Sequence, residues 1–423
     1  MSITAWLAVA SIFVTIAALI KKVEPKLVLL GVGLFLCLVS LKPMAAFDAF
    51  AKMMVTPTLC QSILSAMGFA TLLALTKCDQ HLVQLMVRPL KTLGLFLIPV
   101  CTIVTLFVNT AIPSAGGCAA AVGATLIPVM IRSGISPVGA AASVLAGTIG
   151  SFLNPGSPHQ VLIGEYVGLS SMEVILACMP TYMTLWGVSV VGVTLVEFLL
   201  KDHRYGASHA ALETSEAEAA SAGFKVNLLW AMAPLVPLVL LVLGNTCVPA
   251  IRMGIAQAML IGVVYTMIVT RFNAPKALNE FFRGCGTGFA SIMSIIISAS
   301  VFAAGLTQSG LIDFLIEALK NSSEYARWGG ILGPYVMGIM MGSGDAAAMA
   351  FNTAVTPHAP EFGMEIVDLG NLAYVAGALG RTMSPIAGVV MVVSGIAGVN
   401  PVDVIKRTAP GMIAAILILL FVM

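Results

Sequence analysis

Long apolar stretches separated by short polar turns run along almost the whole chain. A helix that rises 1.5 Å per residue needs about 20 mostly apolar residues to cross about 30 Å of hydrocarbon. Stretches that approach this length fall near residues 3–20, 26–41, 58–76, 172–199, 227–246, 253–270, 285–306 and 404–422. The pattern predicts an all-α integral membrane protein.

Two further apolar regions, residues 93–168 and 329–397, contain Gly, Pro, Ser and Asn where a plain membrane helix would keep Leu and Val. Irregular backbone at membrane depth persists only where protein, water or a ligand satisfies its polar groups. Each region is therefore predicted to hold a re-entrant helical hairpin and then a helix broken at its middle. The predicted hairpins cover about 93–132 and 329–365, and the predicted broken helices cover about 137–168 and 367–397.

One polar stretch, residues 201–226, divides the chain into halves of 1–200 and 227–423. The halves share spaced glycines and prolines, as an internal duplication does. Gly147, Gly150, Pro155, Gly168 and Pro180 recur 230 residues later as Gly377, Gly380, Pro385, Gly398 and Pro410. Each half is predicted to cross the membrane five times, with one of the five helices broken. Because five is odd, the two repeats are predicted to be inverted relative to each other.

The distribution of Lys and Arg predicts the orientation of the chain, because cytoplasmic segments carry an excess of these residues. With the N-terminus outside, the outer side receives Lys42, Lys52, Arg252, Lys320 and Arg327. The inner side receives Lys21, Lys22, Lys26, Lys77, Arg88, Lys91, Arg132, Lys201, Arg204, Lys225, Arg271, Lys276, Arg283, Lys406 and Arg407. Both termini are therefore predicted to lie on the outer side of the membrane and the linker on the cytoplasmic side.

Composition and charge narrow the class further. Of 423 residues, 59% are hydrophobic and 9% are charged, against roughly 25% charged in soluble domains. The chain has no basic run that could neutralise phosphates, which excludes nucleic acid as a partner and leaves membrane lipid. The eight cysteines lie singly in apolar stretches, a spacing typical of packing residues. In the first segment the positive charge follows the apolar run, so we expect a retained helix and no cleaved signal peptide.

The interruptions in the hairpins and broken helices form the predicted substrate site. Half-helix N-termini bind carboxylates through free N–H groups, and freed carbonyls and polar side chains bind small cations. The predicted substrate-binding residues are Asn109, Thr110, Ser114, Gly116, Gly117, Asn154, Pro155, Gly156, Ser157, His159, Ser343, Gly344, Asp345, Arg381, Thr382, Ser384 and Pro385, and Pro113 belongs to the first turn. This arrangement favours a transporter that moves an organic anion together with a cation.

Three ionisable residues carry the predicted chemistry. Arg381 is the only Lys or Arg that this topology places deep in the membrane, where an unpaired guanidinium costs at least about 2.5 kcal/mol. It either binds a substrate carboxylate through its planar fork or forms a structural pair with Asp345. His159 either contacts substrate or a proton, or is a packed residue. Asp345 either carries the driving cation, H⁺ ahead of Na⁺, or serves only as the partner of Arg381.

The predicted coupling-ion site consists of Asp345, Ser343, Ser114 and Asn154. No cofactor and no certain metal site are predicted; the coupling ion is H⁺ or Na⁺. The remaining charged residues are assigned no chemistry, and Glu197 is expected to reach water because it lies within a turn of a helix end.

Several strings resemble the DcuC family of anaerobic C4-dicarboxylate carriers. In the second half these are residues 342–346 (GSGDA), 380–390 (GRTMSPIAGVV) and 401–408; in the first half they are Ser114-Ala115, Gly117, residues 126–130 (LIPVM) and 134–136. The resemblance implies an inverted-repeat carrier of the ion-transporter superfamily, commonly a homodimer, that moves substrate by an elevator-like slide of a transport domain. It also implies succinate, fumarate or malate as substrate, moved by exchange or with a coupling cation.

Relatives often carry Asn at the position of Asp345 and Asp at that of His159, and carriers of this architecture also take amino acids, citrate or other acids. Another small carboxylate or an amino acid is therefore an alternative substrate.

Two other classes compete with a carrier. Residues 342–345 match the GxGD string of intramembrane aspartyl proteases, but such an enzyme needs a second membrane Asp to share a proton. The other six Asp residues are expected in loops or near helix ends. An ion channel would need a ring of subunits around a charged pore, which one intramembrane Arg in a duplicated chain does not suggest.

Overall fold

The computed structural model describes residues 3–21, 23–87, 96–112, 114–204, 225–246, 248–319 and 323–421. Lys22, Arg88, Lys91, Pro113, Lys320 and residues 205–224 of the predicted linker lie outside them. Within the described ranges the elements are helices and no strand is present. Helices long and apolar enough to cross a membrane are Pro57–Thr76, Ala115–Arg132, Pro137–Val167, Met179–Leu199, Ala274–Gln308 and Pro401–Phe421. The predicted all-α membrane class is therefore confirmed.

The predicted plain spans correspond to helices with closely similar bounds. They are α1 Ile3–Ile20, α2 Pro25–Val39, α4 Pro57–Thr76, α10 Ser171–Ala177 with α11 Met179–Leu199, α14 Leu228–Met232 with α15 Leu235–Thr246, α16 Ile255–Thr270, α18 Ser294–Gln308 and α24 Pro401–Phe421. Proline begins many of them, since its missing N–H costs nothing in a first helical turn. Before α18, a π-helical turn at Phe289–Met293 joins it to α17 Ala274–Gly288.

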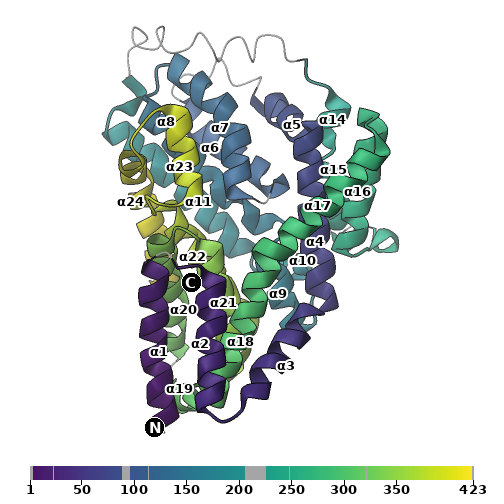
Figure 1. Cartoon of the computed structure of the whole chain (residues 1–423). Coiled ribbons are helices and arrows are strands. Elements are labelled where there is room, and N and C mark those ends of the chain that lie inside the picture. The colour runs from purple at the N-terminus through teal and green to yellow at the C-terminus, as the bar shows by residue number, and fades with distance from the viewer. Residues whose placement is uncertain are drawn as a thin grey trace.

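Three shorter helices were not among the predicted spans. They are α3 Pro43–Met54, α5 Cys78–Val87 and α19 Leu311–Leu319. The α3 and α19 helices lie near the edge of the molecule that holds the N-terminus (Figure 1). These segments are too short and too polar on one side for a window of membrane length to detect them.

Each segment predicted as a hairpin contains two helices that pack on each other, whereas their re-entrant path in a membrane stays a prediction. The first consists of α6 Leu97–Ala111 and α7 Ala115–Arg132, and the second of α20 Ser323–Met341 and α21 Gly344–Ala354. A serine caps the second limb of each: Ser114 Oγ accepts a hydrogen bond from Gly117 N at 3.2 Å, and Ser343 Oγ accepts one from Ala346 N at 3.4 Å. The cap fixes where each limb starts, because it satisfies a free N–H of the first turn.

Both broken helices are also present. The first runs through α8 Pro137–Ala146 and a 3₁₀ segment, η3 Gly147–Leu153, and resumes as α9 Pro158–Val167. The second runs through α22 Ile366–Thr382 and resumes as α23 Gly388–Ala397. At the first break Asn154 holds the chain open, since its Nδ2 donates to Thr110 O at 2.6 Å and its Oδ1 accepts from Gly156 N at 2.7 Å.

Close backbone approach holds the second hairpin against the second broken helix. A Cβ at Gly344 would collide with the carbonyl of Gly377, and a Cβ at Gly380 would collide with that of Tyr335. The α20, α21 and α22 helices therefore pack in direct backbone contact, which a larger side chain at either position would prevent.

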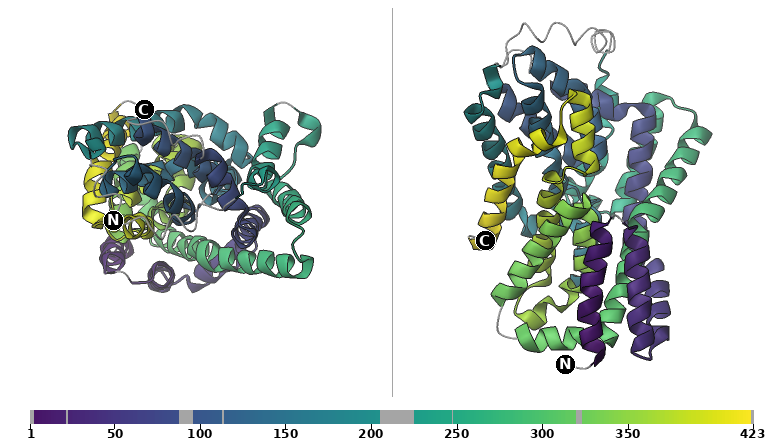
Figure 2. Two further views of the ribbon diagram at one scale, coloured as in Figure 1. Left: turned by 90° about the horizontal axis from the view of Figure 1, so that it is seen from above. Right: turned by 60° about the vertical axis from the view of Figure 1, so that its left-hand side comes forward.

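The helices of the second half begin at a nearly constant distance from those of the first. Helix α2 begins at Pro25 and α16 at Ile255, 230 residues later, and α9 Pro158–Val167 corresponds to α23 Gly388–Ala397 at the same distance. This spacing agrees with the predicted duplication, whereas the inverted orientation in a membrane stays a prediction. Figure 2 gives two further views of how the early helices and the later ones interleave.

The helices form two groups. The scaffold group comprises α1–α4 and α14–α18: α2 and α3 pack on α18, and α4 packs on α16 and α17. The site group comprises α6–α9, α11 and α20–α24, whose side chains supply most of the largest apolar core. Contacts of α4 with α9 and of α18 with α21 join the groups.

In Figure 1, α6–α8 lie in the upper part and α20 and α21 in the lower part, so the hairpins approach the centre from opposite sides.

Candidate substrate site

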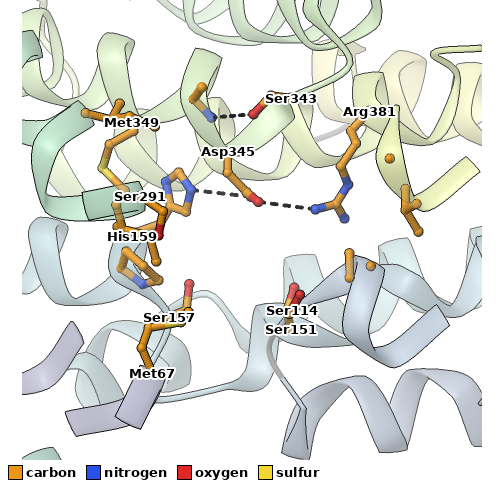
Figure 3. A pocket seen from close by; sticks show the side chains of 18 of the residues that line it. Met67, Ser114, Ser151, Ser157, His159, Ser291, Ser343, Asp345, Met349 and Arg381 are labelled. Atoms are coloured by element: carbon orange, nitrogen blue, oxygen red, sulfur yellow. Dashed lines mark hydrogen bonds and ion pairs between the residues drawn. The ribbon is translucent and has the colours of Figure 1, made fainter. Parts of the chain in front are cut away.

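A cavity of about 580 Å³ lies where the hairpin tips meet the helix breaks (Figure 3). This volume is in the range of small-molecule sites. Predicted residues that line it are Ser114, Gly116, Gly156, Ser157, His159, Ser343, Asp345 and Arg381. The fold therefore brings predicted residues from four separate segments to one cavity.

Four helix N-termini converge on this cavity. Its lining includes Ala115 and Gly116 at the start of α7, Pro158 and His159 at the start of α9, Asp345 at the start of α21, and Gly388 and Val389 at the start of α23. Each N-terminus presents free N–H groups and about half a positive charge. Four of them around one space provide a strong anion-binding environment.

Arg381 is 7% exposed and connects the two halves of the chain. Its Nη1 lies 3.4 Å from Asp345 Oδ2, and its Nη2 donates to the carbonyl of Thr148 at 3.1 Å. Among the described residues its Nε has no acceptor. The pair with Asp345 therefore exists in this structure, but a separation of 3.4 Å exceeds the 2.7–2.9 Å of a close charge-assisted bond. The guanidinium keeps donors for a further anion.

His159 is 2% exposed, and its Nε2 lies 3.7 Å from Asp345 Oδ1. That distance is too long for a hydrogen bond, and within the described part of the chain neither ring nitrogen has a hydrogen-bond partner. The imidazole stacks on Tyr374 with ring centroids 4.1 Å apart and planes at 19°. His159 is thus packed but its nitrogens are unsatisfied, which a buried polar group seldom is.

Asp345 lies between the side chains of Arg381 and His159, as Figure 3 shows. Its side chain is 63% exposed, and it lines the cavity. It belongs to the first turn of α21, where the helix dipole stabilises a carboxylate. Asp345 is therefore a charged group that is free to exchange its partners inside the cavity.

Sequence reasoning missed the hydroxyl groups on one wall of the cavity. Tyr374 Oη accepts a hydrogen bond from Ser157 Oγ at 3.3 Å and lies 3.5 Å from Ser151 Oγ. Ser291, from the π-helical turn before α18, also lines the cavity. A signal for Tyr374 was available: it precedes Arg381 by seven residues, two helical turns, and so lies on the same face of α22.

Nine predicted residues do not line this cavity: Asn109, Thr110, Gly117, Asn154, Pro155, Gly344, Thr382, Ser384 and Pro385. Some brace it from behind. Asn109 Oδ1 accepts from Ser151 N at 2.8 Å, and Thr110 Oγ1 donates to the carbonyl of Gly150 at 3.0 Å. Gly117 and Asn154 line a neighbouring cavity of about 140 Å³, and Pro155 a third of about 220 Å³.

Three of the four predicted coupling-ion residues, Ser114, Ser343 and Asp345, line the large cavity, and Asn154 shares a neighbouring cavity with Ser114. Ser343 caps α21, and the carboxamide of Asn154 is engaged in bracing the first break. Asp345 and Ser114 both line the large cavity, whereas Asn154 does not. Within the described ranges no group of three or more His, Cys, Asp or Glu side chains could hold a metal ion.

The expectation that Glu197 reaches water was wrong. Glu197 is 0% exposed on α11, where its Oε1 accepts from Ser143 Oγ at 2.9 Å. Nearby, Asp202 forms a two-bond pair with Arg407, at 3.0 Å to Nε and 3.2 Å to Nη2. The packing of α8 and α24 on α11 covers this helix end, which a helix read alone cannot reveal.

The fold and the cavity define a multi-span membrane protein with a central polar site of the kind that carriers use. The chain belongs to the DcuC family, because the sequence model of that family, described as C4-dicarboxylate anaerobic carrier, matches residues 38–423. The resemblance stated from the motifs is thus confirmed. Since this is a family of carriers and not of enzymes, the intramembrane protease is excluded.

Individual relatives agree with this assignment. A putative uncharacterized transporter of Haemophilus influenzae is 48% identical over 275 residues, which cover 63% of this chain and 98% of that protein. The anaerobic C4-dicarboxylate transporter DcuC of Escherichia coli K12 is 27% identical over 372 residues, covering 85% and 78%. Among solved structures, MtrF of Neisseria gonorrhoeae, from a class of antimetabolite efflux pumps, matches with a TM-score of 0.61 and 12% identity over 90% of this chain and 83% of MtrF. The last match concerns the fold alone.

Proposed function

We propose that this chain is a secondary active transporter that moves C4-dicarboxylates, such as succinate, fumarate and malate, across the bacterial inner membrane. The observation that carries the proposal is the buried Arg381 at a cavity where four helix N-termini converge. Membership of the DcuC family supports the substrate class.

One substrate carboxylate binds Arg381 and takes the place that Asp345 occupies in this structure. The pair with Asp345 is long enough to be exchanged, and the planar guanidinium forms bidentate bonds with a carboxylate. The second carboxylate lies toward the N-termini of α7 and α9 and the hydroxyl groups of Ser157 and Tyr374. A monocarboxylate forfeits that second set of contacts, so it should bind more weakly.

Transport follows an elevator-like movement in which the site group slides against the scaffold group. The apolar surfaces between α4 and α9 and between α18 and α21 would form the sliding contact. A homodimer that joins the scaffold groups would hold them fixed. Both termini would be periplasmic and the 201–226 linker cytoplasmic.

Net transport is coupled to H⁺ or Na⁺, and Asp345 is the carboxylate whose charge the coupling ion neutralises. Exchange of one dicarboxylate for another needs no gradient of this ion. A carrier of another small carboxylate or of an amino acid remains the alternative, since the cavity is larger than a four-carbon acid requires.

Purified protein in liposomes loaded with succinate should take up labelled fumarate in exchange, with monocarboxylates competing poorly. Failure of succinate, fumarate, malate and aspartate either to move or to compete would reject the dicarboxylate assignment. Uptake of an amino acid or citrate in the same assay would support the alternative.

A further inference from the structure

His159 lies beside Asp345 at the cavity, and the proposed function assigns no role to its imidazole. The ionisable groups that face His159 come from two of the helices packed on α9: Asp345 from α21, and Tyr374 and Arg381 from α22. Helix α4 contributes the apolar Ile63, Ala66 and Met67 to the same cavity.

Two further ionisable groups near α9 are engaged or turned away. Glu173 on α10 is bound to Arg252 at 2.7 Å, and Glu165 on α9 itself is exposed. The described charges at the cavity therefore sum to zero when the imidazole is neutral, because Arg381 offsets Asp345.

Binding of a doubly ionised substrate disturbs this balance. If one substrate carboxylate takes Arg381, then Asp345 loses its cation while it remains inside the protein. An unneutralised carboxylate at membrane depth is costly. The nearest group that can acquire a positive charge is the imidazole of His159, whose Nε2 already lies 3.7 Å from Asp345 Oδ1.

The surroundings of His159 suit a proton. Neither ring nitrogen has a hydrogen-bond partner among the described residues, so protonation breaks no existing bond. The ring stacks on Tyr374 at 4.1 Å, and an aromatic face attracts a cation at this distance. Asp345, 63% exposed to the cavity, can pass the proton from cavity water to the buried imidazole.

We propose that His159 is the proton-binding group of this carrier, and that it takes up one proton when the substrate displaces Asp345 from Arg381. The proton comes from water in the cavity and binds a ring nitrogen, and the imidazolium then pairs with Asp345. The dicarboxylate is thus carried together with one H⁺. This inference rests on the proposed function and specifies its coupling ion.

The test measures protons released or taken up on fumarate binding, by titration calorimetry of the purified full chain in two buffers of different ionisation enthalpy, without Na⁺. Fumarate is chosen because both of its carboxyl groups stay ionised between pH 6 and 8, where histidine titrates. Wild-type protein should take up close to one proton per fumarate bound at pH 8. Because binding then consumes a proton, its affinity for fumarate should fall as the pH rises, by up to about tenfold per pH unit.

Two variants distinguish coupling from a structural role. His159→Gln should bind fumarate more weakly and without proton uptake. Asp345→Asn should bind it without proton uptake although His159 is still present, because no carboxylate is left to neutralise. The control is His358→Gln, which removes a histidine paired with Glu361 at 3.2 Å and absent from the cavity lining, and which should keep the wild-type proton count.

The possible failures are separable. If wild-type protein binds neither fumarate nor any other dicarboxylate, the proposed function fails. If fumarate binds with no proton uptake, or only when Na⁺ is added, then the proposed function stands and the role of His159 is overturned. Proton uptake that persists in His159→Gln would also overturn it.

Discussion

The two halves of the chain build the same frame around the cavity but supply different side chains to it. Cavity residues of the first half correspond to residues of the second at the spacing of the predicted duplication: Ser114 with Ser343 and Gly116 with Asp345 at 229 residues, and Ser151 with Arg381 and His159 with Val389 at 230. Ser caps the hairpin limb in both halves, since the backbone requirement is the same.

At the other matched positions the chemistry has diverged. The second half carries a carboxylate, Asp345, and a guanidinium, Arg381, where the first has Gly116 and Ser151. The first half carries the titratable His159 where the second has Val389. A symmetric pair of helix breaks therefore creates the space, and asymmetric side chains decide what binds there. The predictions that follow test how far these two roles can be separated.

The largest effect is expected from tying the site group to the scaffold group. In a Cys-free background, cysteines replace Ile296 on α18 and Met349 on α21, which belong to one apolar cluster. Bridging the two cysteines with a bifunctional thiol reagent that forms reducible disulfides should abolish exchange, and reduction should restore it. The control is a pair of cysteines within the site group, at Ala146 and Ser189; in the wild type Ser189 Oγ donates to the carbonyl of Ala146 at 2.9 Å. Bridging this pair should leave exchange intact. Full activity with complete bridging of the first pair would argue for a fixed site with local gates.

Arg381→Lys keeps the charge of the second half but removes its planar fork. Charge-assisted hydrogen bonds contribute about 1.5–3 kcal/mol, so dicarboxylate affinity should fall by roughly 10–100-fold. Equilibrium binding and liposome exchange measure the loss. Arg252→Lys, at an exposed bridge to Glu173, is the control and should change neither. Unaltered transport by Arg381→Lys would make Arg381 a structural partner of Asp345 alone.

Gly116→Asp gives the first half the charge that the second half carries at the matched position. A Cβ at Gly116 meets no neighbouring atom within 4 Å, so a side chain can begin there without a clash. A second carboxylate in the cavity should repel the substrate and weaken its binding by about tenfold or more. Gly116→Asn adds the same bulk without charge and should bind nearly as wild type. Equal losses in both variants would assign the effect to bulk instead of charge.

Tyr374→Phe should have the smallest effect. It keeps the stacked ring beneath His159 and removes the hydroxyl that contacts Ser157 and Ser151. One neutral hydrogen bond contributes about 0.5–1.5 kcal/mol, which corresponds to a loss of about 2–10-fold in affinity. Tyr182→Phe, on a buried ring that is absent from the cavity lining, should leave affinity unchanged. Unchanged affinity in Tyr374→Phe would mean that the hydroxyl does not contact the substrate.

The class of protein, most of the spans and the places where helices break could be predicted from the amino-acid sequence. These follow from local causes: apolar runs of membrane length, prolines that begin helices, and Gly, Ser and Asn that interrupt α6–α9 and α20–α23. The sequence also marked Arg381 and Asp345, because a charge deep in a membrane demands a partner. The spacing of the predicted repeat was also visible, because glycines and prolines that meet the same backbone requirement recur at the same interval.

The contacts of these charged side chains, in contrast, depend on how the helices pack. Arg381 reaches the carbonyl of Thr148, 233 positions away in the chain, and His159 stacks on Tyr374 across the two halves. Glu197 is covered by helices that its own sequence neighbourhood does not specify. Such contacts depend on how two halves pack around a shared centre, and local hydrophobicity carries no information about which residues will face each other there.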